Sequence, residues 1–289
     1  METTDLLKRV RQIEIRSRGL SANIFAGSYK TAFKGHGMSF SEVREYQPGD
    51  DVRDIDWNVT ARIGKPHTKI FEEERELTVM LLIDVSGSRE LGTTTQTKQE
   101  QITNIAATLA FSGIQNNDKV GVIFFSDRIE KYIPPQKGKK HVLAIISELL
   151  KFQPVHRGTN IDNAIRYVSN AQKKRCTTFI ISDFFDQHDY QQSLTIANSK
   201  HDVVAIQVYD PRELTMPDVG FLKIRDAETG AERWVDTSSR KVRNLYESWW
   251  INSNEKMKRA FLHSHVDSIA VSTDEDFVPA LLGLFKQRI

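Results

Sequence analysis

The sequence Val79-Met80-Leu81-Leu82-Ile83-Asp84-Val85-Ser86-Gly87-Ser88 decides the fold of this chain. Its first five residues are apolar and rich in branched side chains, which predicts a strand buried on both faces of a sheet. The strand ends in a carboxylate, and two hydroxyls follow at alternate positions, as Asp84-x-Ser86-x-Ser88. In open α/β sheets, ligands bind just beyond the carboxyl ends of the strands. These oxygens are hard donors suited to Mg²⁺ or Mn²⁺, although the same side chains could instead cap the next helix.

Predicted strands and helices alternate after this stretch. Apolar residues recur at helical spacing in some segments and run together in others. Such an alternation predicts right-handed crossovers and a mostly parallel sheet flanked by helices. The short strand predicted over 129–133 should stop at Pro134-Pro135, because proline cannot donate to a strand ladder. The predicted helices cover residues 98–113, 138–152, 189–199, 242–263 and 276–287, and the later strands cover 119–125, 176–181, 203–208 and 268–271.

The first 75 residues have a different texture. They begin with a segment that predicts a short amphipathic helix, and glycines then separate short extended pieces from residue 27 to residue 71. We therefore predict two parts: residues 1–75, a helix with a small β-rich appendage, and residues 76–289, the α/β domain. Residues 212–238 should form a β-hairpin insertion in that domain, turning at Glu228-Thr229-Gly230.

Composition describes a globular protein. Of 289 residues, 39% are apolar and 27% are charged, which is ordinary for a folded domain, and the net charge of +2 gives no global field for nucleic acid. The single cysteine, Cys176, cannot form an internal disulfide and makes a cysteine-based zinc site unfavourable. The sequence contains no secretory signal, and none of its apolar runs approaches the ~20 residues that a membrane helix requires. We therefore expect a cytoplasmic protein without a transmembrane segment.

A longer string resembles a family signature. It runs from Ser39-Phe40-Ser41-Glu42-Val43-Arg44-Glu45-Tyr46-Gln47-Pro48-Gly49-Asp50-Asp51-Val52-Arg53-Asp54-Ile55-Asp56-Trp57 to Thr60-Ala61-Arg62, and Phe71-Glu72-Glu73-Glu74-Arg75-Glu76 continues it into Asp84-x-Ser86-x-Ser88. This pattern is similar to the domain of unknown function fifty-eight, a bacterial family of von Willebrand factor A-like proteins associated with MoxR-type AAA+ ATPases. The resemblance covers roughly residues 27–210. It implies a Rossmann-like, von Willebrand factor A-type open sheet, mostly parallel and flanked by helices, with the appendage and hairpin insertion as additions.

The resemblance also implies a metal site. A von Willebrand factor A-type site draws ligands from three loops: D-x-S-x-S, a threonine, and an aspartate that ends a later strand. The matching residues here, in chain order, are Asp84, Ser86, Ser88, Thr159 and Asp183. Taken singly, Thr159 could be a helix N-cap and Asp183 a turn residue. The nearby Asp162 and Asp186 are expected to cap helices or to hold the ligands in place, not to bind the ion directly. The expected cofactor is Mg²⁺ or Mn²⁺.

Such a site differs from a catalytic one. With few direct carboxylates the ion stays positive, so an Asp or Glu of a partner could replace a water on it. We therefore expect a non-catalytic, metal-dependent protein-interaction module, an adaptor or regulator whose partner is a MoxR-type AAA+ ATPase or its client. The alternative is a Mg-dependent phosphotransferase or phosphatase using Asp84. Haloacid-dehalogenase-like enzymes place a second aspartate two residues after the nucleophile, where this chain has Ser86, which cannot exchange protons near neutral pH. A third reading is a structural protein with a vestigial site.

Aromatic residues lead to two further expectations. Trp57 offers a large apolar surface, so we expect it to be buried as the anchor of the appendage against the sheet. Beside it, Asp54 and Asp56 should accept hydrogen bonds from backbone amides or arginines. The pair Trp249-Trp250 should pack against the body of the domain.

Overall fold

The computed structural model describes residues 3–20, 37–74, 77–90 and 96–288. Its contacts divide the chain into two compact units, one of residues 1–33 with 77–289 and one of residues 34–76. This division differs from the predicted boundary at residue 75 in one respect. Helix α1 (Thr3–Leu20) packs on helices α4 (Lys98–Gln115) and α5 (Lys139–Lys151), so it belongs to the unit that holds the sheet.

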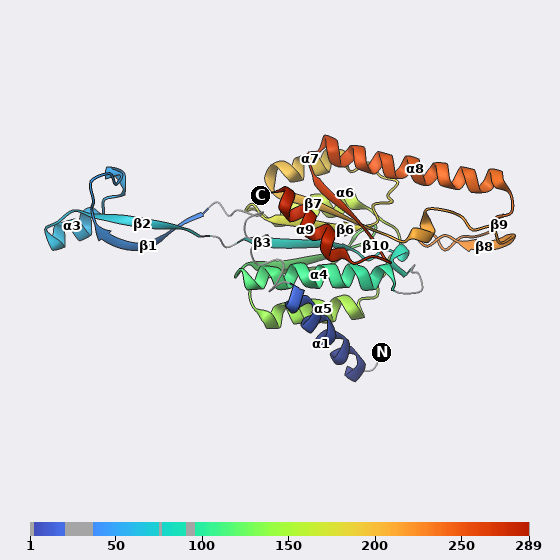
Figure 1. The fold of residues 1–289 in the computed structure, drawn as a ribbon, viewed down its shortest axis with the longest axis horizontal. Coiled ribbons are helices and arrows are strands. Elements are labelled where there is room, and N and C mark those ends of the chain that lie inside the picture. Colours follow the sequence, from blue (N-terminus) through green and yellow to red (C-terminus); the bar gives the residue numbers. More distant parts are fainter. Residues whose placement is uncertain (1–2, 21–36, 75–76, 91–95, 289) are drawn as a thin grey trace. The chain divides into compact units, whose positions relative to one another are not determined.

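A six-stranded sheet forms the centre of the larger unit (Figure 1). Its spatial order is β10-β7-β6-β3-β4-β5, and all neighbouring pairs are parallel except β4 with β5. Counted along the chain this is the 3-2-1-4-5-6 order of a doubly wound fold. The strand order reverses beside β3, where such folds bind ligands. The strands are β3 (Thr78–Asp84), β4 (Lys119–Phe125), β5 (Ile129–Gln136), β6 (Thr177–Ser182), β7 (Asp202–Tyr209) and β10 (Asp267–Ser272).

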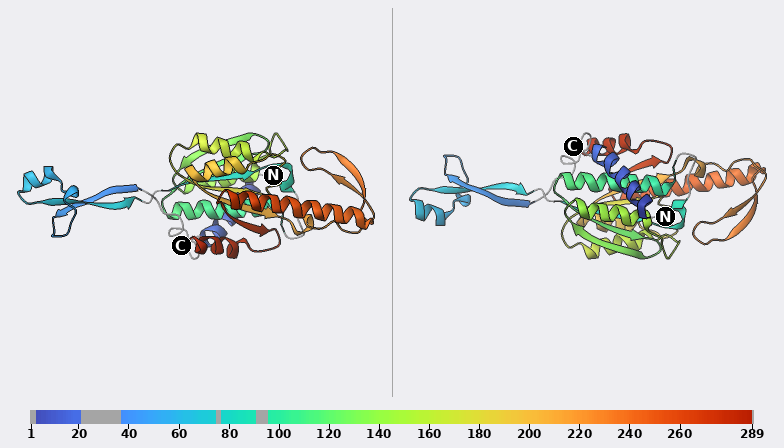
Figure 2. Two further views of the ribbon diagram at one scale, coloured as in Figure 1. Left: turned by 90° about the horizontal axis from the view of Figure 1, so that it is seen from above. Right: turned by 90° about the horizontal axis from the view of Figure 1, so that it is seen from below.

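Helices cover both faces of this sheet (Figure 2). Side chains alternate along β3, so Val79, Leu81 and Ile83 enter one core while Met80 and Leu82 enter the other, all fully buried. Each such burial contributes roughly 1.5–3 kcal/mol, and this accounts for the continuous apolar run. The first core is closed by α4, α5 and α9 (Phe277–Gln287), and the second by α6 (Ile161–Ala171), α7 (Gln191–Lys200) and α8 (Arg240–His263).

Strand β5 runs through both prolines and ends at Gln136. The predicted stop at Pro134-Pro135 was wrong. Both prolines lie where the pairing of this edge strand with β4 is irregular, because the register shifts between the pairs Val120–Gln136 and Val122–Ile133. The missing N–H groups therefore fall at a bulge, and the ladder continues on either side of it.

The predicted hairpin insertion forms β8 (Phe221–Arg225) and β9 (Glu232–Asp236), paired antiparallel. The connecting turn is built by Asp226, whose carboxylate accepts the amides of Glu228 and Thr229. Gly230 follows at φ 71°, a conformation that glycine adopts without strain. Short 3-10 turns, η3 (Gly87–Glu90) and η4 (Pro211–Glu213), complete this unit.

The smaller unit is an antiparallel pair, β1 (Gly37–Glu45) and β2 (His67–Glu74), with a turn η2 (Val52–Asp54) and a helix α3 (Trp57–Ile63) between them. Asp56 caps α3 by accepting the amides of Asn58 and Val59, as expected for that carboxylate. The expected burial of Trp57 was wrong, because 66% of the residue is exposed at the start of α3.

Candidate metal centre

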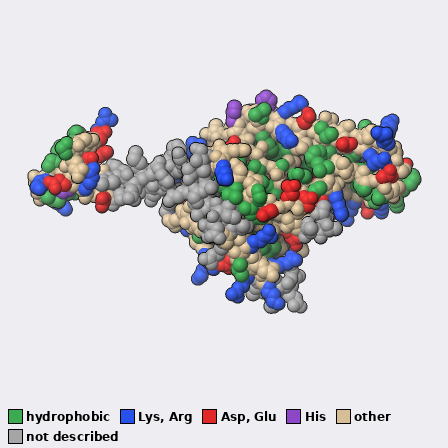
Figure 3. Space-filling view, viewed as in Figure 1, with side chains coloured by type: hydrophobic (Ala, Val, Ile, Leu, Met, Phe, Trp, Pro, Cys, Tyr) green, Lys and Arg blue, Asp and Glu red, His purple; other side chains and the backbone are tan. Residues whose placement is uncertain are grey.

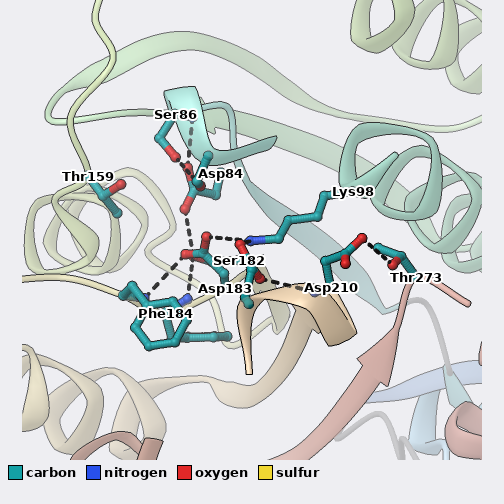
Figure 4. A network of polar contacts seen from close by, with 12 residues as sticks. Asp84, Ser86, Lys98, Thr159, Ser182, Asp183, Phe184, Asp210 and Thr273 are labelled. Carbon is teal, nitrogen blue, oxygen red and sulfur yellow. Dashed lines mark hydrogen bonds and ion pairs between the residues drawn. The ribbon is translucent and has the colours of Figure 1, made fainter. Parts of the chain in front are cut away.

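The predicted ligands begin at the carboxyl ends of β3 and β6, two adjacent parallel strands (Figure 4). Asp84 is the last residue of β3 and Ser182 the last of β6. The Ser182 hydroxyl donates to Asp84 Oδ2 at 2.6 Å, and the Ser86 amide donates to Asp84 Oδ1 at 2.8 Å. Asp84 is only 4% exposed, so its carboxylate is held in one orientation.

Two hydroxyls follow on the loop after β3. The oxygens of Ser86 and Ser88 lie 3.1 Å apart. Adjacent ligands of an octahedral Mg²⁺ at ~2.1 Å are separated by about 3 Å, so this spacing suits two ligands of one ion. The alternative that these residues cap the next long helix does not hold, because Thr97 caps α4 in a capping box with Glu100.

Thr159 arrives from the loop before α6. That loop is tied to the first one because the Gly87 amide donates to the Arg157 carbonyl at 3.0 Å. The N-cap of α6 is Asn160, so the Thr159 hydroxyl is free of capping and turns toward Asp84 and Ser86 (Figure 4). It donates to Glu228 Oε1, on the hairpin, at 2.8 Å.

Asp183 follows β6 and contacts a buried lysine. Lys98 Nζ lies 3.1 Å from Asp183 Oδ2 and 2.5 Å from Glu213 Oε1, and the lysine side chain is 1% exposed. Burial by itself disfavours the ammonium, but the charges of Asp183 and Glu213 outweigh it and raise the pKa of Lys98. The other Asp183 oxygen accepts the Phe185 amide at 3.2 Å, as a turn aspartate does.

Asp84 and Asp183 repel each other in the absence of a second cation. Burial first, and then the charge of Asp183, raise the pKa of Asp84 to about 7. Burial likewise raises the pKa of Glu228, with Asp183 adding to the effect and the Thr159 hydroxyl opposing it. A divalent ion beside these carboxylates would relieve the repulsion.

These residues fit a hard divalent cation. In the described residues no group of three or more His, Cys, Asp and Glu is arranged to hold a metal, and the predicted set contains only two carboxylates. Its other donors are the hydroxyls of Ser86, Ser88 and Thr159. Since most carboxylate oxygens already accept hydrogen bonds, Asp84 and Asp183 would orient waters on such an ion, and the hydroxyls would be its direct ligands.

The two neighbouring aspartates have different positions. Asp186 Oδ2 accepts the Ile161 amide at 2.7 Å, which joins the loop after β6 to the start of α6, so this residue has the supporting role expected for it. Asp162 pairs with Arg166 one turn along α6 and accepts the hydroxyl of Ser193 on α7, so it joins two helices and caps neither.

Four residues of the site were not found from the sequence: Ser182, Lys98, Glu213 and Glu228. Ser182 was visible only as the neighbour of Asp183. Lys98 opens a helix, where a lysine is ordinarily solvated, and no local pattern indicates that Asp183 and Glu213 enclose it. Glu228 stood in a predicted turn 69 residues from Thr159.

A cavity of about 600 Å³ opens beside the site. Ser88, Asp183 and Glu228 line one part of it, and the other lining residues include both aromatic side chains and charged ones such as Glu213 and Lys256. Trp249 stacks on Phe185 with ring centroids 5.6 Å apart, so this tryptophan packs on the body as expected while 53% of it stays exposed. Figure 3 shows hydrophobic side chains scattered over the face of the molecule that carries α8.

A family model described as "Protein of unknown function DUF58" matches residues 42–256. The chain belongs to this family. The uncharacterized protein Rv1480 of Mycobacterium tuberculosis H37Rv is 30% identical over 230 residues, which cover 79% of this chain and 73% of the relative. The uncharacterized protein YeaD of Bacillus subtilis is 27% identical over 114 residues, covering 39% of this chain and 26% of that protein. The resemblance seen in the signature is therefore confirmed.

Solved structures agree with the fold of this DUF58 protein. An aerotolerance-related membrane protein from Bacteroides fragilis superimposes with a TM-score of 0.51 at 17% identity, covering 73% of this chain and 98% of the other. The SpRpn10 VWA domain matches with a TM-score of 0.38 at 10% identity, covering 73% of this chain and 95% of that domain. The sheet order above and the first of these superpositions confirm the predicted α/β fold, an open, mostly parallel sheet flanked by helices. In the described residues no helix is long and apolar enough to cross a membrane.

Proposed function

We propose that this DUF58 protein is a non-catalytic, metal-dependent protein-interaction module. The observation that carries the proposal is the meeting of three loops at the carboxyl edge of the sheet, where Asp84 and Asp183 stand beside three hydroxyls (Figure 4). Mg²⁺ or Mn²⁺ held there would supply a positive, partly hydrated centre. A carboxylate of a partner protein could replace one of its waters.

The partner we propose is a MoxR-type AAA+ ATPase or its client, for which this protein would act as adaptor or regulator. This part of the proposal is supported by the family resemblance, while the chemistry of the site supports the requirement for an acidic side chain on the partner. The cytoplasmic location remains a prediction.

A phosphotransferase or phosphatase would use Asp84 as its nucleophile. In this structure Asp84 is 4% exposed and accepts a hydrogen bond on each oxygen. Ser86 stands where the general acid would be needed, and a neutral hydroxyl does not exchange protons near pH 7. These observations favour binding over catalysis, so we expect no turnover of a phosphate ester with Mg²⁺.

Thermal unfolding with and without millimolar Mg²⁺ tests the metal centre. A ligand that binds only the folded state at ten times its Kd stabilises it by about 1.4 kcal/mol, or about 3 °C for a chain of this size. Asp84→Ala should remove this response, whereas Glu247→Ala, on the exposed face of α8, should keep it. An equal shift in the Asp84 variant would place the ion elsewhere.

The same variants test the partner. Binding to a purified MoxR-type ATPase should need Mg²⁺ and fail with chelator, and Thr159→Val should weaken it because one oxygen donor is lost without a change of shape. Binding that is equal with Mg²⁺ and with chelator would show that the metal centre is not the docking site.

A further inference from the structure

The tip of the β8–β9 hairpin reaches the candidate metal centre. Glu228 Oε1 accepts the hydroxyl of Thr159 at 2.8 Å, so a third carboxylate stands beside the hydroxyl donors. Glu228 and Ser88 also line the same cavity. The Glu228 carboxylate does not belong to the three loops of the predicted site; it comes from the hairpin insertion that follows β7.

The backbone of the hairpin touches the loop after β3 as well. A Cβ atom on Gly87 would lie 2.2 Å from the carbonyl oxygen of Ala227, which no side chain permits. Gly87 is the residue between the two serines of the Asp84-x-Ser86-x-Ser88 motif. The glycine therefore lets the hairpin lie directly on the metal-binding loop.

The position of Glu228 is fixed by its own turn. Asp226 Oδ1 accepts the amide of Glu228 at 3.0 Å and that of Thr229 at 2.8 Å, and the Asp226 amide donates to the Ala231 carbonyl at 2.8 Å. A carboxylate held by a formed turn loses less conformational freedom when it binds than one on a mobile loop.

We propose that Glu228 is an additional metal ligand, supplied from within the chain at the place where a partner's acidic side chain would otherwise bind. The inference rests on the proposed function and deepens it. A partner that offers Asp or Glu to the ion must displace Glu228, so the hairpin competes with the partner for one coordination position. Release of the hairpin then becomes part of partner binding.

Calorimetric titration with Mn²⁺ tests the ligand role. Glu228→Gln keeps the size of the side chain but removes its charge, and we expect Mn²⁺ to bind at least about tenfold more weakly, the loss typical of groups that support a metal. Glu232→Gln is the matched control, since Glu232 lies on the same hairpin with an exposed side chain paired to Lys223. Its affinity should equal that of the wild type.

Hydrogen exchange gives a second readout on the hairpin itself. Mn²⁺ should slow the amides of residues 221–236 in the wild type and leave them unchanged in Glu228→Gln. Gly87→Ala retains every oxygen donor but displaces the Ala227 carbonyl, so it should also remove this protection. Equal protection in all three proteins would overturn the proposal.

The outcomes separate the two proposals. If Asp84→Ala abolishes Mn²⁺ binding while Glu228→Gln binds as tightly as the wild type, the role of Glu228 is overturned and the metal centre stands. If the wild type binds no Mn²⁺, both are overturned. Should circular dichroism show that Asp84→Ala is unfolded, Ser88→Ala takes its place, since it removes one half-buried hydroxyl donor.

Discussion

Lys98 shows how a single buried charge is retained in this interior. Its ammonium lies between Asp183 and Glu213 at the start of α4, almost without contact to solvent. Removing one partner from a buried ionic group leaves the others uncompensated, which typically costs about 3–5 kcal/mol. We therefore expect Lys98→Met to lower the free energy of unfolding by that amount in urea denaturation. Lys258→Met, on the exposed face of α8, should change it by less than ~0.5 kcal/mol.

Equal urea midpoints for Lys98→Met and the wild type would contradict this account. They would mean that Asp183 and Glu213 find another cation, or that Glu213 takes up a proton, without loss of stability. Burial already raises the pKa of Glu213 against the pull of Lys98, so protonation of this carboxyl is the first explanation to test, by repeating the denaturation at lower pH.

Cys176 gives a prediction about pH. Burial raises the pKa of its thiol from the ordinary value of 9.0 to about 11. At pH 7 the folded protein should hold about 100-fold less thiolate, so alkylation should be slow until urea unfolds the chain. Because the folded thiol keeps its proton to higher pH, its contribution to stability should fall as pH rises from about 9 toward 11.

The measurement is mass spectrometry, because a single cysteine gives a single alkylated product. Fast labelling of the folded protein at pH 7 would show that the thiol is accessible. Cys176→Ala should lose the decline of stability above about pH 9 that is assigned to the thiol.

At the scale of single residues, the sequence alone predicts which polar side chains lie at the ends of strands. Asp84, Ser86 and Ser88 follow a buried strand, and Asp183 follows another, so sheet geometry alone brings them together. The partners of these residues could not be found in the same way. Lys98 and Asp183 are 85 residues apart, and a contact over that separation is set by how α4 lies on the sheet, which no local pattern encodes.

Helix α3 is bounded at its start by a capping side chain and at its end by a glycine in the left-handed conformation. Asp56 caps its first turn, and Gly64 ends it at φ 76°. We expect Asp56→Ala to cost about 1 kcal/mol, the usual loss for an N-cap carboxylate. Trp57→Ala should cost less than ~0.5 kcal/mol because the ring is exposed.

Native-state hydrogen exchange of the amides in residues 58–64 would report both values. Opening free energies that fall by about 3 kcal/mol in Trp57→Ala would show that the ring is buried in solution after all. No change in Asp56→Ala would show that α3 is held by contacts other than its cap.

The elements differ in how far they could be predicted. Strands β3, β4, β6 and β7 are buried on both faces, so each contains several consecutive apolar residues, although β6 begins with two threonines and β7 includes Gln207. Helix α3 has seven residues and no buried side chain, and hence no apolar periodicity to detect. Strand β5 continues through two prolines because its pairing with β4 is irregular there, a feature that depends on its place at the edge of the sheet.

At the scale of the molecule, the strand order explains where the candidate centre lies. The chain proceeds from β3 to β4 and β5 on one side and later to β6, β7 and β10 on the other. Loops from both halves therefore start at adjacent carboxyl ends and diverge, which leaves room between them. The hairpin insertion, attached beyond β7, reaches this place with Glu228.

The division into two compact units leads to a final prediction. Binding stabilises only the cooperative unit that contains the site, because local openings elsewhere leave the ion bound. Mn²⁺ should therefore slow hydrogen exchange in β3, β6 and the rest of residues 77–288, where the opening free energies should rise by up to the free energy of Mn²⁺ binding. Residues 37–74 should exchange at unchanged rates. Asp84→Ala is the control, in which neither unit should respond. Equal slowing of both units in the wild type would mean that residues 34–76 open only together with the sheet, so that the two units behave as one cooperative structure.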